Sequence, residues 1–237
     1  MRLYLFPMKN RQPIREVIFD DALIWLNQHR VTAETSFVAS LPDKSEFPKF
    51  TLNDWKTWFG DTAELIIKKT PPEGIAIFYQ SDIKVEGTWI DKSFLIMKAA
   101  ERQNAELLFH KIICRTLPGI LTLGRPAYSH LIGFSRNFRM PENCTLFADV
   151  VPDIGEKTWQ RGMGLNACLG IADFLEKKTT TKTLINPFCG EGSMLAAANA
   201  RGLDAIGIER SPKRVQKAQH LQLDETETSW VFSHKES

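Results

Sequence analysis

Apolar residues are distributed along the chain in two patterns, short continuous runs and longer segments in which they recur every three or four positions. Continuous runs of this length are typical of strands buried on both faces. They predict strands at 35–43, 75–82, 129–136 and 205–209, with shorter ones at 119–123 and 229–233. The second pattern predicts helices at 13–29, 51–70, 91–115 and 164–178, although 15–19 also fits a strand.

Segment 184–218 contains a strand, a glycine loop, a helix, a strand and a second helix in close succession. Strands that alternate with helices in this way favour an α/β fold, with a mostly parallel sheet covered by helices on both faces. A length of 237 residues with 43% hydrophobic residues suits one such domain. Residues 136–160 have no clear periodicity and read as an irregular connection.

Composition says more about the cellular compartment of the protein than about its function. A net charge of +2 neither indicates nor excludes a nucleic-acid partner. The four cysteines contain no C-x-x-C pair, which argues against a disulfide framework or a zinc site and favours a reducing cytoplasm. The N-terminus is too charged for a signal peptide, and no apolar run approaches the roughly 20 residues of a membrane span.

The glycine loop at 189–193 indicates a bound cofactor. Gly190 and Gly192 allow a tight turn that brings backbone N–H groups close to a ligand, and Glu209 ends the next strand, where an acid can bind a ribose diol. A dinucleotide site would have a third glycine where Leu195 stands, and the charge of Glu191 would repel a pyrophosphate. A cationic cofactor such as S-adenosylmethionine fits better, whereas the alternative is a tight turn with no ligand.

The stretch "NPFCGEGSMLAAANARGLDAIGIERSPKRVQKA" resembles the cofactor-binding segment of class I S-adenosylmethionine-dependent methyltransferases, particularly nucleic-acid amino-methyltransferases and RNA methylases. The resemblance implies a Rossmann-like sheet with one antiparallel strand. Asn186 replaces the usual Asp and Glu191 the usual small residue, and Cys189 is expected in the pocket wall and not as a nucleophile. The implied cofactor-binding residues are Met163, Asn186, Pro187, Phe188, Cys189, Gly190, Glu191, Gly192, Ser193 and Glu209.

The order of the motifs resembles the permuted members of this family, in which the catalytic motif precedes the cofactor loop. Only about twenty residues follow the second helix, so the remaining strands must lie upstream. The family motif, Asp/Asn/Ser-Pro-Pro-aromatic, is matched in part by "SLPD", which is Ser40, Leu41, Pro42 and Asp43. The resemblance thus divides the single domain 1–237 into a catalytic and substrate half (1–135), a connection (136–160) and a cofactor-binding half (161–237).

By the same resemblance, the Ser40 hydroxyl and the Leu41 carbonyl accept hydrogen bonds from a target amine. Asp43 stands where an aromatic residue stacks on a flipped base, so stacking would have to come from Phe47, Trp55 or Tyr79. The alternative is that "SLPD" is only a strand end and a turn. The end of the following strand supplies three polar residues that are candidates for substrate contacts, Gln80, Asp82 and Lys84.

The sequence therefore predicts an S-adenosylmethionine-dependent methyltransferase that acts on RNA or unpaired nucleic acid at an amino or base nitrogen. The connection at 136–160 is too short and too weakly charged for sequence-specific duplex recognition. Two alternatives remain: a methyltransferase for a small molecule or protein side chain, and a non-catalytic binding module. A protein partner or a homodimer is left open, and no membrane partner is expected. No metal is expected either, because the five histidines lack metal-ligand spacing.

Overall fold

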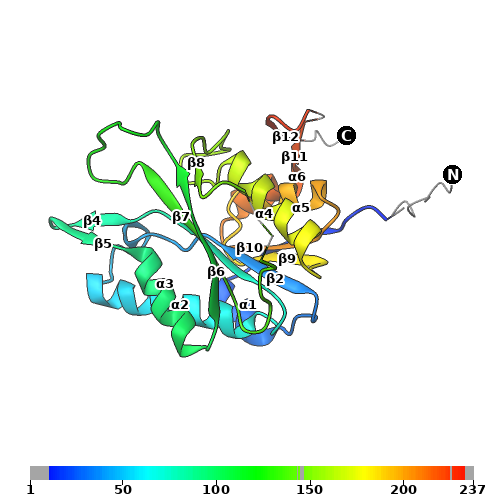
Figure 1. Ribbon diagram of the computed structural model, residues 1–237, viewed down its shortest axis with the longest axis horizontal. Helices are drawn as coiled ribbons and strands as arrows, with labels where there is room; N and C mark the ends of the chain where they lie inside the picture. Colours follow the sequence, from blue (N-terminus) through cyan, green and yellow to red (C-terminus); the bar gives the residue numbers. More distant parts are fainter. Residues whose placement is uncertain (1–10, 143, 145–146, 225, 233–237) are drawn as a thin grey trace.

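A computed structural model describes residues 11–142, 144, 147–224 and 226–232. A central sheet of eight strands runs through the molecule, in the spatial order β1-β10-β9-β2-β3-β7-β6-β8 (Figure 1). Its strands are β1 (Arg15–Phe19), β2 (Thr35–Ala39), β3 (Ala76–Gln80), β6 (Glu106–Cys114), β7 (Tyr128–Ser135), β8 (Val150–Val151), β9 (Thr183–Asn186) and β10 (Asp204–Glu209). Strand β7 runs antiparallel to both of its neighbours, and every other pairing in this sheet is parallel.

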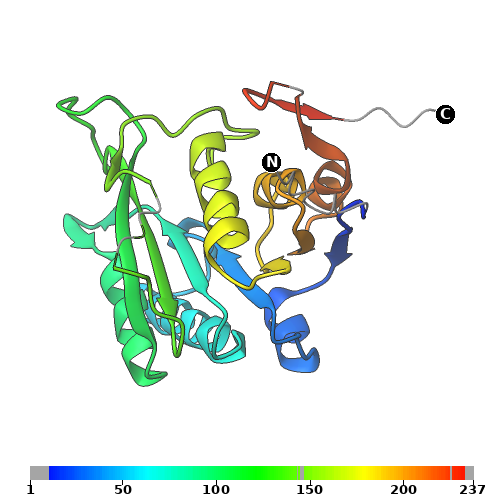
Figure 2. The same ribbon diagram turned by 45° about the vertical axis from the view of Figure 1, so that its right-hand side comes forward.

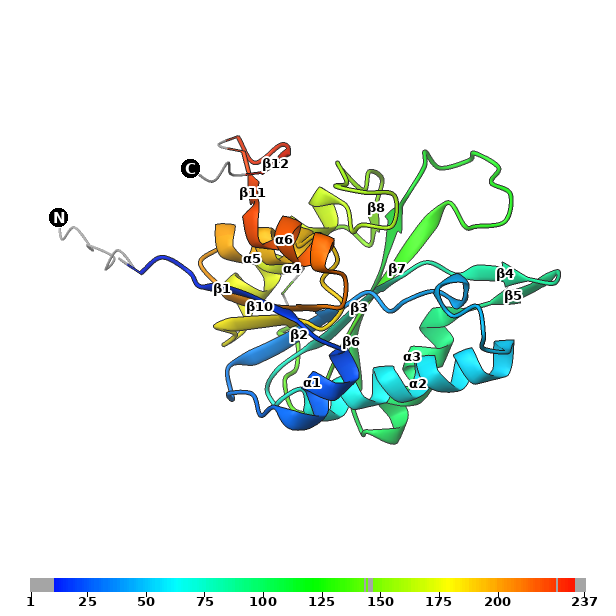
Figure 3. The same cartoon turned by 180° about the vertical axis from the view of Figure 1, so that it is seen from behind.

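Helices cover both faces of the sheet, as the sequence predicts (Figure 1, Figure 3). One face carries α1 (Ala22–Gln28), α2 (Leu52–Lys69) and α3 (Lys92–Arg102), and the other α4 (Leu165–Lys178), α5 (Ser193–Ala200) and α6 (Pro212–His220). Each helical layer has its own apolar core against the sheet. Two small hairpins are separate from the central sheet. One pairs β4 (Ile83–Val85) with β5 (Thr88–Ile90), and the other pairs β11 (Leu221–Leu223) with β12 (Trp230–Phe232).

Local sequence accounts for several of the helix boundaries. Thr51 and Asp54 cap each other's backbone N–H groups at the start of α2, at 2.9 and 3.1 Å. Asp21 accepts hydrogen bonds from the N–H groups of Leu23 and Ile24 and so begins α1. The helix expected over 13–29 is therefore confined to 22–28, and the preceding residues form β1.

The predicted helix over 91–115 is wrong in its second half. Helix α3 ends at Arg102, and Asn104 takes a left-handed conformation with φ 50° before β6 begins. The apolar spacing of segment 106–114 fits either a helix or a strand. The segment forms a strand because it pairs with β7 along nearly its whole length. The expected partner at 119–123 forms no strand but lies in the loop between β6 and β7. The run at 229–233 extends beyond the described residues, and its described part pairs with β11 outside the main sheet.

Strands β2 and β9 lie side by side and parallel, with Phe37 opposite Ile185. A hydrogen bond of 2.7 Å between the hydroxyls of Ser36 and Thr181 joins the two segments. The carboxyl ends of the two strands therefore meet at one edge of the sheet, and "SLPD" and the glycine loop both follow there (Figure 2). Every helix in the described part of the chain is too short or too polar to cross a membrane.

Candidate active site

A cavity of about 450 Å³ opens at this edge of the sheet. Strand β2 contributes the segment that follows it, Ser40 to Asp43, and β9 contributes Asn186 to Glu191. A cavity outside the carboxyl ends of adjacent parallel strands is the usual ligand site of open α/β sheets. The predicted cofactor residues on its surface are Met163, Asn186, Pro187, Phe188, Cys189, Gly190, Glu191, Ser193 and Glu209.

The glycine loop is held by hydrogen bonds to its own backbone and to β10. Gly190 and Gly192 have φ of 57° and 90°, in the left-handed region that favours glycine. Glu209 accepts hydrogen bonds from the N–H groups of Gly190 at 3.2 Å and Ser211 at 2.9 Å, so its carboxylate is fixed at the cavity wall. Gly192 is not on the cavity surface. It makes room for α6, since an added Cβ would lie 2.7 Å from the Cα of Ala218.

Glu191 lines the cavity and has one unpaired carboxylate oxygen. Its side chain is buried, and Oε1 accepts a hydrogen bond of 2.5 Å from Lys217. Oε2 is buried and has no hydrogen-bond partner among the described residues. A buried carboxylate oxygen that lacks a partner favours a cationic ligand, which agrees with the sequence argument against a pyrophosphate.

Cys189 has the environment of a wall residue. It is buried, and desolvation, followed by the nearby charge of Glu209, raises the pKa of its thiol well above the ordinary value. A nucleophilic cysteine needs a lowered pKa. The Sγ of Cys189 also packs close to Gly207, since a Cβ added to Gly207 would lie 2.8 Å from it. The geometry is therefore that of packing and not of nucleophilic attack.

A side chain of α2 holds the "SLPD" segment in place by a hydrogen bond. Ser40, Leu41, Pro42 and Asp43 all line the cavity. The Pro42 carbonyl accepts a hydrogen bond of 3.2 Å from the indole of Trp55, which is fully buried. Trp55 thus stabilises the position of the segment. It does not line the cavity, so it is not available for stacking on a base. Phe47 and Tyr79 do line it.

Asp43 is paired with two cations that sequence reasoning missed. Its carboxylate forms ion pairs with Lys92 and, at 3.0 Å, with Arg125. Lys92 is almost completely buried at the first position of α3, above the rings of Trp55 and Phe59. Burial lowers the pKa of Lys92, and the opposite charge of Asp43 offsets part of that effect. These pairings cross more than 40 positions of the chain, so no local pattern could have indicated them.

The three candidate substrate residues at the end of β3 separate in the structure. Gln80 lines the cavity, and its amide Nε2 is buried with no hydrogen-bond partner in the described part of the chain. Asp82 is buried away from the cavity surface, and Lys84 is exposed on the β4–β5 hairpin. Only Gln80 of the three is therefore placed to contact a ligand in the cavity.

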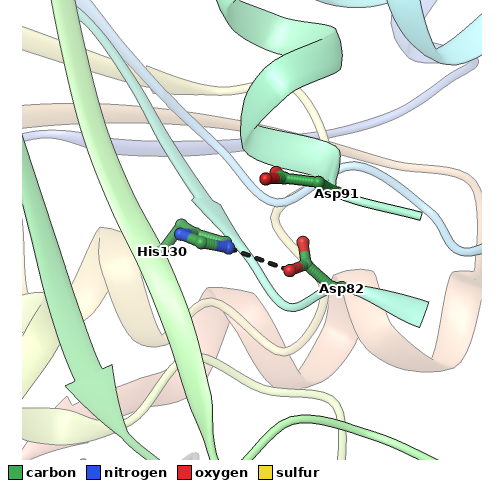
Figure 4. Close-up of side chains that lie close together, drawn as sticks. All are labelled: Asp82, Asp91 and His130. Atoms are coloured by element: carbon green, nitrogen blue, oxygen red, sulfur yellow. Dashed lines mark hydrogen bonds and ion pairs between the residues drawn. The ribbon is translucent and has the colours of Figure 1, made fainter. Parts of the chain in front are cut away.

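Asp82 instead belongs to a polar cluster with His130, which is also buried, and Asp91, which is exposed (Figure 4). Their potential ligand atoms lie within 4.8 Å of one another. The Asp82 carboxylate accepts hydrogen bonds from His130 Nε2 at 3.1 Å, the Lys92 N–H at 2.9 Å and the Trp89 indole at 3.3 Å. Burial works against ionisation of Asp82, but the hydrogen bonds from His130 and Lys92 prevail and lower its pKa. These hydrogen bonds account for the cluster, and the expected absence of a metal stays a prediction.

A segment from the end of the irregular connection covers the cofactor side of the cavity. Trp159 packs against Gly190, whose added Cβ would lie 3.6 Å from the indole, and the Arg214 guanidinium lies 4.3 Å from its ring centroid. Arg161 reaches across to Glu46, just after "SLPD", in an ion pair of 3.2 Å. The sequence predicts only a connection at 136–160, because an irregular segment has no apolar periodicity from which the contacts of a single residue could be predicted.

Comparisons with known proteins identify the fold. The sequence matches no protein-family model, and no curated protein matches it. Among solved structures, a candidate DNA modification methylase from Thermus thermophilus is similar with a TM-score of 0.66 and 17% identity, covering 86% of this chain and 92% of its own. PvuII DNA methyltransferase (cytosine-N4-specific) has a TM-score of 0.66 and 13% identity, covering 89% and 88%. The M1.HpyAVI–SAM complex has a TM-score of 0.56 and 15% identity, covering 87% and 98%. The chain therefore has the fold of class I S-adenosylmethionine-dependent methyltransferases.

Proposed function

We propose that this protein transfers a methyl group from S-adenosylmethionine to an exocyclic amino group of a base in DNA. The observation that carries the proposal is the meeting of two motifs at one cavity. "SLPD" at the end of β2 faces the space beside the glycine loop that follows β9. Methyl transfer requires the acceptor and the methyl donor to be held in line, and adjacent strand ends can provide that arrangement.

The cofactor half of the cavity suits each part of S-adenosylmethionine. Glu209 keeps a carboxylate at the wall, where it can accept hydrogen bonds from ribose hydroxyls. The free Oε2 of Glu191 matches a cationic group, and the cofactor has both a sulfonium and an ammonium. Phe188 and Met163 add apolar surface. When bound, the cofactor supplies an activated methyl group on sulfur.

The acceptor half suits a primary amine. The Ser40 hydroxyl and the Leu41 carbonyl can accept its two N–H hydrogen bonds, which directs the nitrogen lone pair towards the methyl carbon. With the cofactor bound, a C–N bond would form as the S–C bond breaks, the electron pair would stay on sulfur, and the proton lost by the nitrogen would pass to water. Asp43 is held by Lys92 and Arg125, so its role is to fix the segment more than to accept that proton.

The choice of DNA departs from the expectation of RNA drawn from the sequence. Two of the similar structures are named as DNA-modifying methyltransferases, and one of these is named as specific for cytosine N4. This supports an exocyclic base amine as the acceptor and gives no support to RNA. The permuted motif order and the division into halves at 135 and 160 stay predictions.

A second candidate function is methylation of a small molecule. The observation that favours it is the pair of cations at Asp43, in the place where a stacking aromatic residue would be expected. Phe47 is the aromatic residue nearest along the chain that lines the cavity, and it packs on Trp58 at 4.4 Å between ring centroids. A base substrate therefore requires stacking from another aromatic residue of the cavity, Phe47 or Tyr79, in place of position 43.

Two measurements test the proposal. Calorimetry should show binding of S-adenosylmethionine, and labelled cofactor should transfer its methyl group to DNA in preference to RNA, protein or a small-molecule extract. Ser40→Ala removes one hydrogen bond to the amine and should lower kcat on DNA by about tenfold. Ser229→Ala, outside the cavity, is the control and should have no effect. Transfer to RNA alone, or to extract alone, would reject DNA as the acceptor.

A further inference from the structure

The loop between β6 and β7, residues 115–127, exposes large aliphatic side chains to solvent. Leu121 and Leu123 are 96% and 99% exposed, and Leu117 and Ile120 are 69% and 52% exposed. The loop contains two arginines and no acidic residue. Four exposed aliphatic side chains in one short loop are unusual on a protein surface and indicate a contact with another molecule.

The loop has a defined shape although it does not bury its leucines. Its two ends are joined by a hydrogen bond of 2.6 Å from the Arg115 N–H to the Ala127 carbonyl. Near its tip the Thr122 hydroxyl donates to the Arg125 carbonyl at 2.6 Å. Gly119 and Gly124 make the turns, with φ of 89° and 80°. The exposed leucines therefore project from a folded loop.

The loop rises from the rim of the cavity. Arg115 and Arg125, at its two ends, both line the cavity. Arg125 also contacts the Asp43 carboxylate at 3.0 Å, so the base of the loop is tied to the "SLPD" segment. In Figure 1 and Figure 3 the loop, drawn in green, extends beyond the end of β6 and the start of β7, away from the helices. Its leucines thus stand outside the opening through which a large substrate would approach.

We propose that the loop 115–127 is a wedge that enters duplex DNA beside the target base, with Leu121 and Leu123 taking the space that the base leaves. This inference rests on the proposed function. A base in a duplex must leave the stack before its amine can reach Ser40, and unstacking costs a few kcal/mol. Inserted apolar side chains such as leucine offset that cost in proteins that kink or open DNA.

Charge favours DNA over a second copy of this chain. Arg115 and Arg125 flank the leucines, and the loop has no acidic residue. Lys157 and Arg161 line the same cavity, where Arg125 and Arg161 are paired with Asp43 and Glu46. The positive charge that flanks the apolar side chains complements a phosphate backbone around a stack of bases. A second copy of this chain would bring the same arginines to the interface, where like charges would face each other. An anionic membrane surface would satisfy the charges, so it is tested directly.

The test compares native and heat-denatured DNA as methyl acceptors. In the double variant Leu121→Ser/Leu123→Ser, kcat/KM on native DNA should fall at least tenfold, whereas kcat/KM on denatured DNA should change less than twofold. The matched control is Leu107→Ser, which removes a 47% exposed leucine at the opposite end of β6. Equal losses on both substrates, unchanged activity on native DNA, or a wild type that methylates only denatured DNA would overturn the proposal.

Binding measured without turnover separates this proposal from the function on which it rests. A gel-shift titration with a 30-base-pair duplex should show at least tenfold weaker binding by the double variant. If the variant loses duplex binding but the wild type transfers no methyl group, the wedge stands and the methyltransferase proposal fails. If duplex binding is unchanged, while binding to phosphatidylglycerol vesicles or self-association in light scattering is lost, the loop contacts a membrane or a second copy and the wedge is rejected.

Discussion

Lys92 and Asp43 form an ion pair at the rim of the cavity although they lie 49 positions apart in the chain. The side chains are 2% and 13% exposed. Burial lowers the pKa of Lys92, and the charge of Asp43 acts in the opposite direction. A buried charge that loses its partner is strongly destabilising, so the pair links the stability of the fold to the position of "SLPD".

Asp43→Asn should therefore lower the free energy of unfolding by about 3 kcal/mol at pH 7, since it leaves Lys92 buried with a neutral neighbour. Urea denaturation measures this. Adding Lys92→Met to Asp43→Asn should recover a large part of the loss, because the double variant has no unpaired ammonium. Glu16→Gln, at an exposed position of β1, is the control. Additive effects of the two substitutions would contradict the pairing.

The same pair predicts how stability depends on pH. In the folded protein the pKa of Lys92 lies below the ordinary lysine value of 10.5, whereas in the unfolded chain it returns to that value. Between the two values the unfolded chain binds more protons, so the stability of the wild type should rise with pH relative to that of Lys92→Met. In Asp43→Asn the rise should begin at lower pH. Parallel profiles from pH 7 to 10 would show that Lys92 keeps its ordinary pKa.

The parts of the site that the sequence predicts are those that depend on neighbouring residues. The glycine loop occupies five consecutive positions, and both glycines have the left-handed backbone that their residue type suggests. The placement of "SLPD" beside that loop was predicted from the resemblance in motif order, and β2 does lie beside β9. Short-range chemistry and the order of the motifs were enough for these features.

The parts that the sequence misses depend on contacts between distant segments. Lys92 stands at the start of an ordinary amphipathic helix, and only the folded chain shows that it faces Asp43. Trp159 lies in an irregular connection, yet it packs on Gly190. The error at 106–114 has the same origin, because apolar spacing fitted both a helix and a strand and the ladder with β7 decided between them.

Glu191 should matter for the cationic part of the cofactor and not for its adenosine. Glu191→Gln removes the charge of a buried carboxylate whose Oε2 has no partner among the residues that the structure describes. We expect it to weaken S-adenosylmethionine binding by about 1.5 kcal/mol, roughly tenfold, as expected for a hydrogen bond to a charged group. Binding of methylthioadenosine, which lacks the ammonium and the sulfonium, should be unchanged. Calorimetry with both ligands measures this, and an equal loss for both would place Glu191 elsewhere.

Glu209 should matter for the ribose. Glu209→Ala removes a charged acceptor and should weaken binding of both S-adenosylmethionine and methylthioadenosine by about 1.5–3 kcal/mol. It also removes the acceptor of the Gly190 N–H group, so thermal unfolding without ligand should be measured in parallel. Unchanged affinity for both ligands would count against the proposed cofactor. Loss for S-adenosylmethionine alone would indicate that Glu209 contacts its cationic end.

The two glycines of the loop should respond differently to alanine although both have positive φ. At either position the left-handed backbone costs alanine about 1–2 kcal/mol. At Gly192 the new Cβ would also lie 2.7 Å from the Cα of Ala218 in α6, a backbone atom that cannot move aside easily. Overpacking of this kind adds about 1–3 kcal/mol, so Gly192→Ala should be the more destabilising variant in urea denaturation.

Gly190→Ala should instead act on cofactor binding more than on stability. The atoms nearest its Cβ would be those of the Trp159 ring, 3.6 Å away in ordinary contact, and Gly190 lines the cavity whereas Gly192 does not. We therefore expect Gly190→Ala to stay folded and to bind S-adenosylmethionine at least tenfold more weakly, a loss of about 1.4 kcal/mol. Gly192→Ala, measured at a temperature where it is folded, should lose less affinity than Gly190→Ala. The reverse order in either measurement would mean that Gly192, and not Gly190, is the glycine that approaches the cofactor.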